Sequence, residues 1–223
     1  MSEGEFTGKV ILVTGAASGL GRAASLGFAL EGGSLCLVDL NAEGLEETTR
    51  RIEEAGGICT SLAGDLGKPE TCARAVATAV EAFGQLDVLC NVAGILRFHA
   101  LADVTPEEWN ALIATNVSAA FFTMQAAMPY LVENRGNVVN VVSTAAFLGQ
   151  AYTAPYAATK SALLSLTKSL ALEFMHQPVR INALAPGGML TEMVQELKFP
   201  EGADQSLIER YIGLRPPSQP EDI

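Results

Sequence analysis

Short apolar runs alternate with amphipathic segments along most of the chain, and this alternation constrains the fold more than any other feature. Strands alternating with helices predict a mostly parallel sheet with helices on both faces. A chain of 223 residues is long enough for one such domain, so we expect a single doubly wound, Rossmann-like α/β domain over residues 1–223. The predicted strands cover 9–14, 34–39, 58–65, 86–91, 137–143 and 179–185, and the predicted helices cover 19–31, 41–55, 69–83, a long segment from Pro106, and 155–175.

Charge and cysteine content argue against several classes of protein. The sequence has 14 Lys and Arg against 25 Asp and Glu, a net charge of −11, and no basic patch for a nucleic-acid backbone. Its 4 cysteines form no CxxC pair and no histidine cluster accompanies them, so we expect no metal site. Free thiols within apolar runs are typical of a reduced compartment, which predicts a cytoplasmic location.

The sequence shows no sign of secretion or membrane insertion. Its start, MSEGEFTGK, lacks the apolar run that follows the basic start of a signal peptide. No stretch of about 18 uncharged apolar residues occurs, so we expect no membrane-spanning segment.

A glycine-rich turn follows the first predicted strand. Residues 14–21 read TGAASGLG, which sets Gly15, Gly19 and Gly21 in a GxxxGxG spacing between a strand and a helix. Glycines there let bare backbone approach a pyrophosphate, and the positive N-terminus of the next helix points at the same anion. A glycine cluster alone could be an ordinary turn, but the strand before it and the helix after it favour a dinucleotide site.

The second predicted strand ends in Asp39. A carboxylate at this place accepts hydrogen bonds from the adenosine ribose hydroxyls and repels a 2′-phosphate. Capping of the next turn is the alternative role. Because neither residues 16–18 nor Leu40 supplies a cation for a 2′-phosphate, the sequence predicts NAD as the cofactor.

Tyr156 and Lys160 stand four residues apart on a predicted helix and therefore share one face. Free tyrosine has a pKa of about 10 and is a poor acid-base catalyst at neutral pH. A nearby ammonium stabilises the phenolate, so we expect Lys160 to lower the pKa of Tyr156. Taken alone, such a pair is more often two surface residues, and its weight depends on the motifs around it.

Further motifs follow the third to sixth predicted strands. They are Asp65-Leu66, Asn91-Val92-Ala93-Gly94, Asn116 in the long helix, Ser143, and Pro186-Gly187 with Thr191. Together with TGAASGLG and the YAATK run at 156–160, this set resembles the short-chain dehydrogenase/reductase family of single-domain type. The resemblance runs from Lys9 to the last residue.

The resemblance implies a role for each motif. Ser143 would hydrogen-bond the substrate oxygen and Tyr156 would exchange the proton. Lys160 would lower the pKa of Tyr156 and hold the nicotinamide ribose, and Asn116 would anchor a water that links Lys160 to solvent. The implied cofactor site comprises Gly15, Ser18, Gly19, Leu20, Gly21, Asp39, Asp65, Leu66, Asn91, Ala93, Gly94, Tyr156, Lys160, Pro186, Gly187, Met189 and Thr191.

Family members usually continue beyond the point where this chain stops, through a further helix and strand. We therefore expect about thirty residues to be missing after Ile223, which would leave a sheet edge bare. Residues 189–214 are predicted to form a mobile flap of short helices. The resemblance also implies that the long helix and the helix at 155–175 pair across a two-fold axis, giving a homo-oligomer, a dimer or a tetramer.

The substrate is the least constrained part of the prediction. The residues expected to face it are mostly apolar and suggest a hydrophobic secondary alcohol or ketone: Leu96, Phe98, His99, Phe147, Gln150, Met189, Met193 and Val194. Simple packing is the alternative for the apolar flap residues, and a surface or capping role is the alternative for His99.

The sequence predicts an NAD-dependent alcohol dehydrogenase or ketone reductase, and two alternatives remain open. One is an NADPH-dependent 3-ketoacyl reductase, against which Asp39 and the lack of basic residues to receive a phosphorylated carrier argue. The other is a cofactor-binding regulator without turnover, against which the complete set of Asn116, Ser143, Tyr156 and Lys160 argues.

Overall fold

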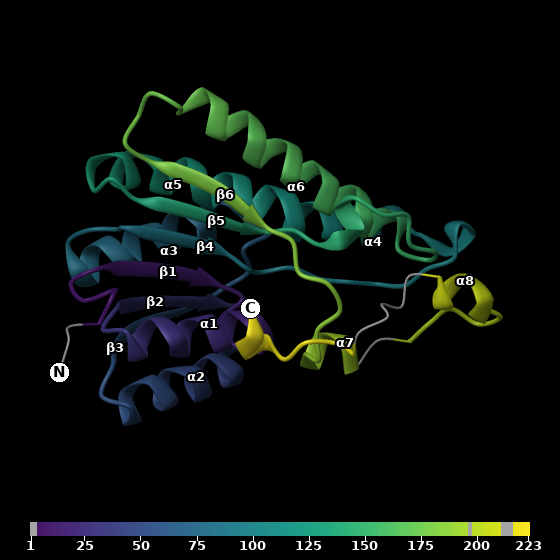
Figure 1. Ribbon diagram of the computed structural model, residues 1–223, viewed down its shortest axis with the longest axis horizontal. Coiled ribbons are helices and arrows are strands. Elements are labelled where there is room, and N and C mark those ends of the chain that lie inside the picture. Colours follow the sequence, from purple (N-terminus) through teal and green to yellow (C-terminus); the bar gives the residue numbers. More distant parts are fainter. Residues whose placement is uncertain (1–3, 196–197, 211–215) are drawn as a thin grey trace.

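The computed structural model describes residues 4–195, 198–210 and 216–223. Its centre is a parallel sheet of six strands in the order β3-β2-β1-β4-β5-β6 (Figure 1). This confirms the predicted doubly wound α/β fold. The strands are β1 (Val10–Thr14), β2 (Ser34–Asp39), β3 (Ile58–Ala63), β4 (Val88–Asn91), β5 (Asn137–Val141) and β6 (Arg180–Leu184).

Helices cover both faces of the sheet. Helices α1 (Gly19–Leu30) and α2 (Ala42–Glu54) pack on one face, and α3 (Pro69–Phe83), α5 (Ala119–Glu133) and α6 (Ala154–Glu173) pack on the other. Both faces are therefore apolar, and β1 at the centre is buried along its whole length. The predicted strands 58–65 and 137–143 end two residues early, because Gly64 and Val142 already belong to the turns at the carboxyl edge.

The strand order reverses beside β1, which pairs with β2 on one side and with β4 on the other. The connections after these two strands leave in opposite directions, and this opens a crevice at their carboxyl ends. In open α/β sheets ligands bind at such a switch point. The sheet topology therefore directs the search for a site to the ends of β1 and β4.

The long helix predicted from Pro106 contains a local irregularity. It runs as α4 (Pro106–Ile113), a π-helical turn η2 (Ala114–Ser118) and α5. Its start is fixed by a capping box, in which the Thr105 hydroxyl accepts a hydrogen bond from Glu108 N and the Glu108 carboxylate accepts one from Thr105 N. A π turn widens the helix by one residue and is frequent at functional sites; this one contains Asn116.

By length and composition alone, one helix within the described residues could cross a membrane, namely Pro106–Glu133, although the sequence had suggested none. In the structure α5 packs against α3 and the sheet. Met124 and Leu131 on it are fully buried in the main apolar cluster. We therefore assign this helix to the core of the domain.

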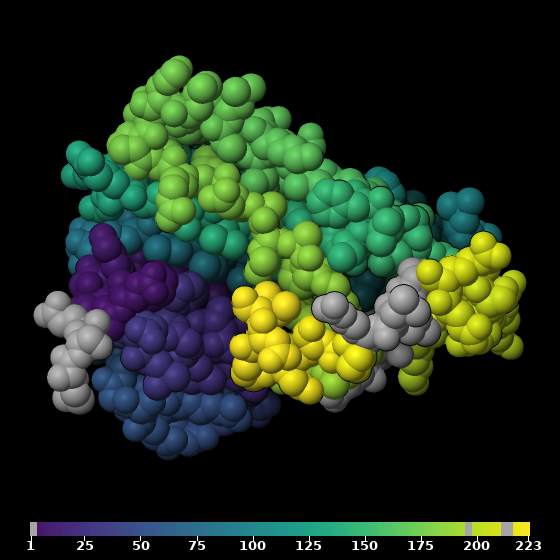
Figure 2. Space-filling model, in the orientation of Figure 1, coloured from purple at the N-terminus to yellow at the C-terminus, as the bar shows by residue number. Residues whose placement is uncertain are grey.

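The chain after β6 crosses the carboxyl edge of the sheet. The predicted flap over 189–214 contains two short helices, α7 (Glu192–Gln195) and α8 (Gln205–Glu209), and residues 196–197 and 211–214 of it lie outside the described residues. The chain then returns, and Ser218 pairs with Met189 in a bridge. The last residues (yellow in Figure 2) pack on α1 through the 3-10 helix η4 (Pro220–Asp222).

Candidate active site

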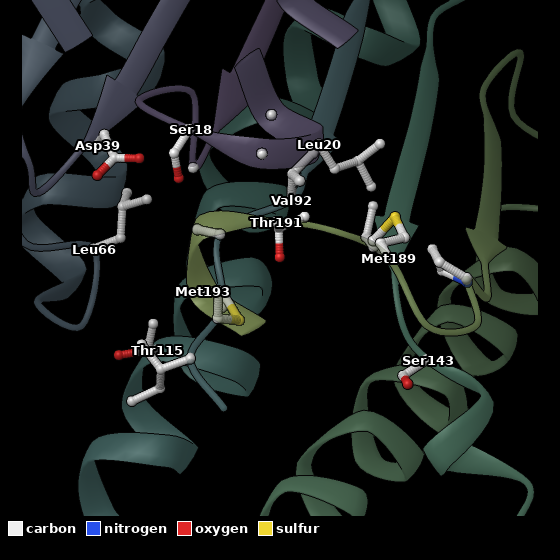
Figure 3. A pocket seen from close by; sticks show the side chains of 18 of the residues that line it. Ser18, Leu20, Asp39, Leu66, Val92, Thr115, Ser143, Met189, Thr191 and Met193 are labelled. Atoms are coloured by element: carbon white, nitrogen blue, oxygen red, sulfur yellow. The ribbon is translucent and has the colours of Figure 1, made fainter. Parts of the chain in front are cut away.

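A cavity of about 310 Å³ opens at the carboxyl ends of the strands, where the topology places a site. Ser18 and Asp39 lie at one end of it and Ser143 at the other, with Thr191 and Met193 of the flap between them (Figure 3). Every residue of the expected cofactor site lines this cavity except Asn91. The lining also includes residues that the motifs did not single out for it: Leu40, Gly64, Val92, Ile95, Thr115, Val141, Val142 and Met193.

The glycine loop between β1 and α1 is shaped so that only glycine fits. Gly15 has a φ of +71°, and a Cβ there would lie 2.9 Å from the backbone of Ala93. A Cβ on Gly21 would lie 2.0 Å from the Gly15 carbonyl oxygen. The loop therefore presents bare backbone to the cavity, with the N-terminus of α1 behind it. This cradle fits a dinucleotide pyrophosphate.

Asp39 at the end of β2 has a structural role besides lining the cavity. Its Oδ2 accepts a hydrogen bond from Ala17 N at 3.0 Å, and its Oδ1 accepts one from Asn41 N at 2.9 Å. The turn-capping role that the sequence left as an alternative is thus present. Since the side chain also lines the cavity, the two roles are compatible.

A cation near this end of the cavity was overlooked in the sequence. Arg22 on α1 donates hydrogen bonds to the carbonyl oxygens of Ala17 and Gly44 and, at 3.0 Å, to Thr48 Oγ1. Its position directly after Gly21, the last glycine of the loop, was the available signal. Through these hydrogen bonds Arg22 braces the loop against α2, and its Nη1 lies 3.6 Å from Glu192 Oε1.

Ser143, Tyr156 and Lys160 all line the cavity. Ser143 follows β5 and Tyr156 lies on α6, and the Ser143 side chain is near enough to lower the pKa of Tyr156. Lys160 is buried, with 4% of its surface exposed, and its Nζ donates to the Val141 carbonyl at 2.8 Å. Its Nζ lies 5.7 Å from the centre of the Tyr156 ring. The three side chains thus form one cluster.

Burial dominates the electrostatics of this cluster. Desolvation raises the pKa of Tyr156 above its ordinary value, and the hydrogen bond with Ser143 only partly offsets that rise. Burial lowers the pKa of Lys160 to about 8. Desolvation is the largest cause of the Tyr156 shift in the cofactor-free protein, and the lowering of this pKa by Lys160 stays a prediction. Burial favours the neutral form of each residue.

Asn116 does not line the cavity but lies directly behind it, buried in the π turn. Its Oδ1 accepts from Ile95 N at 2.8 Å, and its Nδ2 donates to the Ile95 carbonyl at 2.9 Å and to Thr159 Oγ1 at 3.0 Å. Thr159 in turn donates to the Tyr156 carbonyl at 2.7 Å. These bonds connect the loop after β4, the long helix and α6. Thr159, next to Lys160 in the YAATK run, is a site residue that the sequence analysis missed.

Two further positions define the floor of the site. A Cβ on Gly94 would lie 3.3 Å from Asn116 Oδ1 and 3.4 Å from Lys160 Nζ, so glycine keeps this approach open. Asn91 is buried beneath the cavity, where its Nδ2 donates to Asn140 Oδ1 at 2.8 Å. The expectation that Asn91 lines the cofactor cleft is therefore corrected to a supporting position, because its side chain is directed to β5.

The residues expected to face a substrate are only partly brought together. Met189 and Met193 line the main cavity. Phe98 and His99, with Met193, border a second, more open cavity of about 800 Å³ that also contains Arg97 and Lys198. The Nε2 atom of His99 lies 3.2 Å from Glu108 Oε1. Leu96, Phe147, Gln150 and Val194 line neither cavity.

Comparison with known proteins defines the class. The family model described as short chain dehydrogenase matches residues 9–201. The chain therefore belongs to the short-chain dehydrogenase family, whose members are oxidoreductases that bind nicotinamide cofactors.

Individual relatives cover most of the chain. It is 40% identical over 185 residues to a 2,5-dichloro-2,5-cyclohexadiene-1,4-diol dehydrogenase, LinX, of Sphingobium indicum, covering 82% of this chain and 74% of the relative. It is 35% identical over 217 residues to the 3-oxoacyl-[acyl-carrier-protein] reductase FabG of Thermotoga maritima, covering 97% and 87%. A short chain dehydrogenase from Mycobacterium paratuberculosis, solved bound to NAD, superposes with a TM-score of 0.90 at 26% identity, covering 98% and 89%.

Proposed function

We propose that this protein transfers a hydride between NAD(H) and a secondary alcohol or ketone. The observation that carries the proposal is the shared cavity: the glycine loop and Asp39 form one end, and Ser143, Tyr156 and Lys160 form the other. A dinucleotide held by the loop would extend toward the tyrosine. The residues of one cavity thus combine cofactor binding with acid-base chemistry.

In this proposal the side chains move and stabilise the proton. The bound nicotinamide supplies the hydride donor or acceptor. Tyr156 donates its hydroxyl proton to the carbonyl oxygen in reduction, and takes the alcohol proton in oxidation. Ser143 lines the same cavity as Tyr156 and orients the substrate oxygen beside the tyrosine hydroxyl. The Lys160 ammonium lies behind the ring and favours the phenolate when it forms.

NAD is favoured over NADP by charge at the Asp39 end of the cavity. The carboxylate there would repel a 2′-phosphate, and the neighbouring Leu40 offers no compensating charge. Arg22, which follows the glycine loop in the chain, hydrogen-bonds to backbone carbonyls and Thr48 and is paired with Glu192. The NAD-bound structural relative agrees with this choice.

The substrate proposed is a hydrophobic alcohol or ketone, because Met189 and Met193 border the cavity and Phe98 stacks on Phe199 with ring centres 4.3 Å apart nearby. A second candidate is 3-ketoacyl reduction. It is favoured by the likeness to a 3-oxoacyl-[acyl-carrier-protein] reductase and by Arg97 and Lys198 at the second cavity, which could attract an anionic carrier. Asp39 argues against the NADPH that this candidate requires.

The test is an assay of NADH formation across a panel of hydrophobic secondary alcohols, with NADP as the parallel cofactor. We expect NAD-dependent oxidation of at least one alcohol and little reaction with NADP. NADPH-dependent reduction of a 3-ketoacyl thioester, without NAD-linked activity on any alcohol, would favour the second candidate instead.

A further inference from the structure

A carboxylate from the flap touches the N-terminus of α1. Glu192 Oε2 accepts a hydrogen bond from Gly19 N at 3.1 Å, and Glu192 Oε1 lies 3.6 Å from the Arg22 guanidinium. Glu192 and Gly19 are 173 positions apart in the chain, so the contact is created by the fold. It connects the first residue of α7 to the glycine loop.

The Gly19 amide is one of the free N–H groups at the positive end of α1. Among the described residues, the N-cap Ser18 makes no side-chain capping hydrogen bond, and the first turn of α1 contains no acidic residue. Glu192 thus supplies the anion that this helix end lacks locally. The site it occupies is the one where the glycine loop would hold a cofactor pyrophosphate.

The residue before Glu192 also lies against the glycine loop. A Cβ on Gly19 would lie 3.1 Å from Thr191 Cγ2, so Thr191 rests directly on the glycine loop. Thr191 and Met193 both enter the cavity (Figure 3). Glu192 itself borders the second cavity, and its carboxylate reaches the proposed cofactor site at the Gly19 amide, where it is the group most similar to a phosphate.

We propose that Glu192 is a built-in competitor of the cofactor pyrophosphate and so determines how tightly the dinucleotide binds. This inference rests on the proposed function. Two anions cannot share the Gly19 amide, so the pyrophosphate displaces the carboxylate and breaks its ion pair with Arg22. The Glu192 side chain is 54% exposed, so it can leave toward solvent without disturbing the core.

Only molecules whose Glu192 carboxylate has left the Gly19 amide can bind the pyrophosphate. The apparent dissociation constant is therefore the intrinsic constant divided by the fraction of such molecules. Displacement of the carboxylate also links cofactor binding to the flap, since the contact that the cofactor removes is one that fixes α7 on the glycine loop. The dissociation constant of a ligand without a phosphate should not depend on Glu192.

The test measures binding by calorimetry with NAD, ADP and adenosine. In Glu192→Gln we expect the dissociation constants for NAD and ADP to fall by about three- to tenfold, while that for adenosine stays unchanged. Glu201→Gln is the matched control, because it removes the same charge from an exposed position of the same segment without touching Gly19. It should leave all three constants as in wild type. Equal melting temperatures would show that both variants are folded.

Unchanged or weaker binding of NAD and ADP to Glu192→Gln, with wild-type protein binding NAD, would overturn this inference alone. An equal gain for adenosine would also overturn it, because the effect would not depend on the phosphates. Wild-type protein that binds neither NAD nor NADP would overturn the proposed function and this inference together.

Discussion

The Lys160 ammonium lies 5.7 Å from the centre of the Tyr156 ring and gives its hydrogen bond to the Val141 carbonyl at 2.8 Å. The two side chains are close enough to interact but are not hydrogen-bonded to each other in the cofactor-free protein. Desolvation raises the pKa of Tyr156, and burial lowers that of Lys160 to about 8. The resting cluster therefore holds a protonated tyrosine, the form needed to protonate a carbonyl.

The first prediction concerns the direction of the pH dependence. Oxidation needs the phenolate of Tyr156, and the raised pKa moves its formation to higher pH. Between about pH 7 and 10 the rate of alcohol oxidation should rise, whereas ketone reduction should fall, because it needs the protonated form. Initial rates at saturating cofactor would show this. Oxidation that is flat or falls over this range would contradict the assigned role.

The second prediction concerns the stability cost of burying Lys160. Its folded pKa of about 8 lies below the unfolded value of 10.5. Below about pH 8 both states are protonated and the folded state carries the full desolvation cost. As the pH rises to about 10.5 the folded state loses its proton first, so this cost disappears.

Lys160→Met should therefore gain stability relative to wild type at neutral pH, and the advantage should shrink by about 2–3 kcal/mol between about pH 8 and 10.5. Urea unfolding at several pH values measures this difference. Lys168→Met, exposed on the same helix, is the control and should show no such trend. A constant difference between Lys160→Met and wild type would mean that the buried lysine keeps an ordinary pKa.

The third prediction concerns cofactor choice. Repulsion by Asp39 should make NAD bind at least about tenfold more tightly than NADP, a difference of roughly 1.4 kcal/mol. Asp39→Asn removes the charge but keeps an acceptor for Ala17 N or Asn41 N, so it should narrow the difference with little loss of stability. Asp39→Ala should narrow it as well and lower the melting temperature. Equal affinities of wild type for both cofactors, measured by calorimetry, would refute the electrostatic argument.

The fourth prediction concerns Thr159, which joins Asn116 to the Tyr156 carbonyl. Thr159→Val keeps the shape of the side chain but removes the hydroxyl that accepts a hydrogen bond from Asn116 Nδ2. Because this buried donor then lacks a partner, the free energy of unfolding should fall by about 1–3 kcal/mol. Thr159→Ser retains the hydroxyl and should recover most of that loss. If the serine and valine variants were equally stable, the hydroxyl would not be the source of the effect.

Much of this architecture could be predicted from the sequence, because the signals are local. Apolar strands such as 34–39 and the Gly15, Gly19 and Gly21 spacing each specify backbone conformation within a few residues. Parallel topology then brings the strand ends together. The cavity consequently contains Asp39, Ser143 and Tyr156, as the motifs indicated.

The features that escaped prediction depend on distant contacts. The Glu192 contact with Gly19 spans 173 positions, and no local pattern indicates it. The π turn around Asn116 arises where the long helix meets Ile95 and Thr159, with which Asn116 exchanges hydrogen bonds. The pKa of Tyr156 rises because of burial, which a spacing of four residues cannot reveal.

The fifth prediction tests the central claim, that Tyr156 exchanges the proton with the substrate. Tyr156→Phe keeps the ring and its packing but removes the only exchangeable proton of that side chain. We expect kcat for NAD-linked alcohol oxidation to fall by about a hundredfold or more, with the dissociation constant for NAD nearly unchanged. Ser143→Ala should also lower kcat without weakening NAD binding, because Ser143 is assigned to the substrate.

The decisive measurement is therefore the single comparison of kcat and NAD affinity in wild type and Tyr156→Phe, using an alcohol that the wild type oxidises. A large loss of kcat with intact NAD binding is the predicted result. Turnover at the wild-type rate by Tyr156→Phe would contradict the account and leave only a cofactor-binding fold.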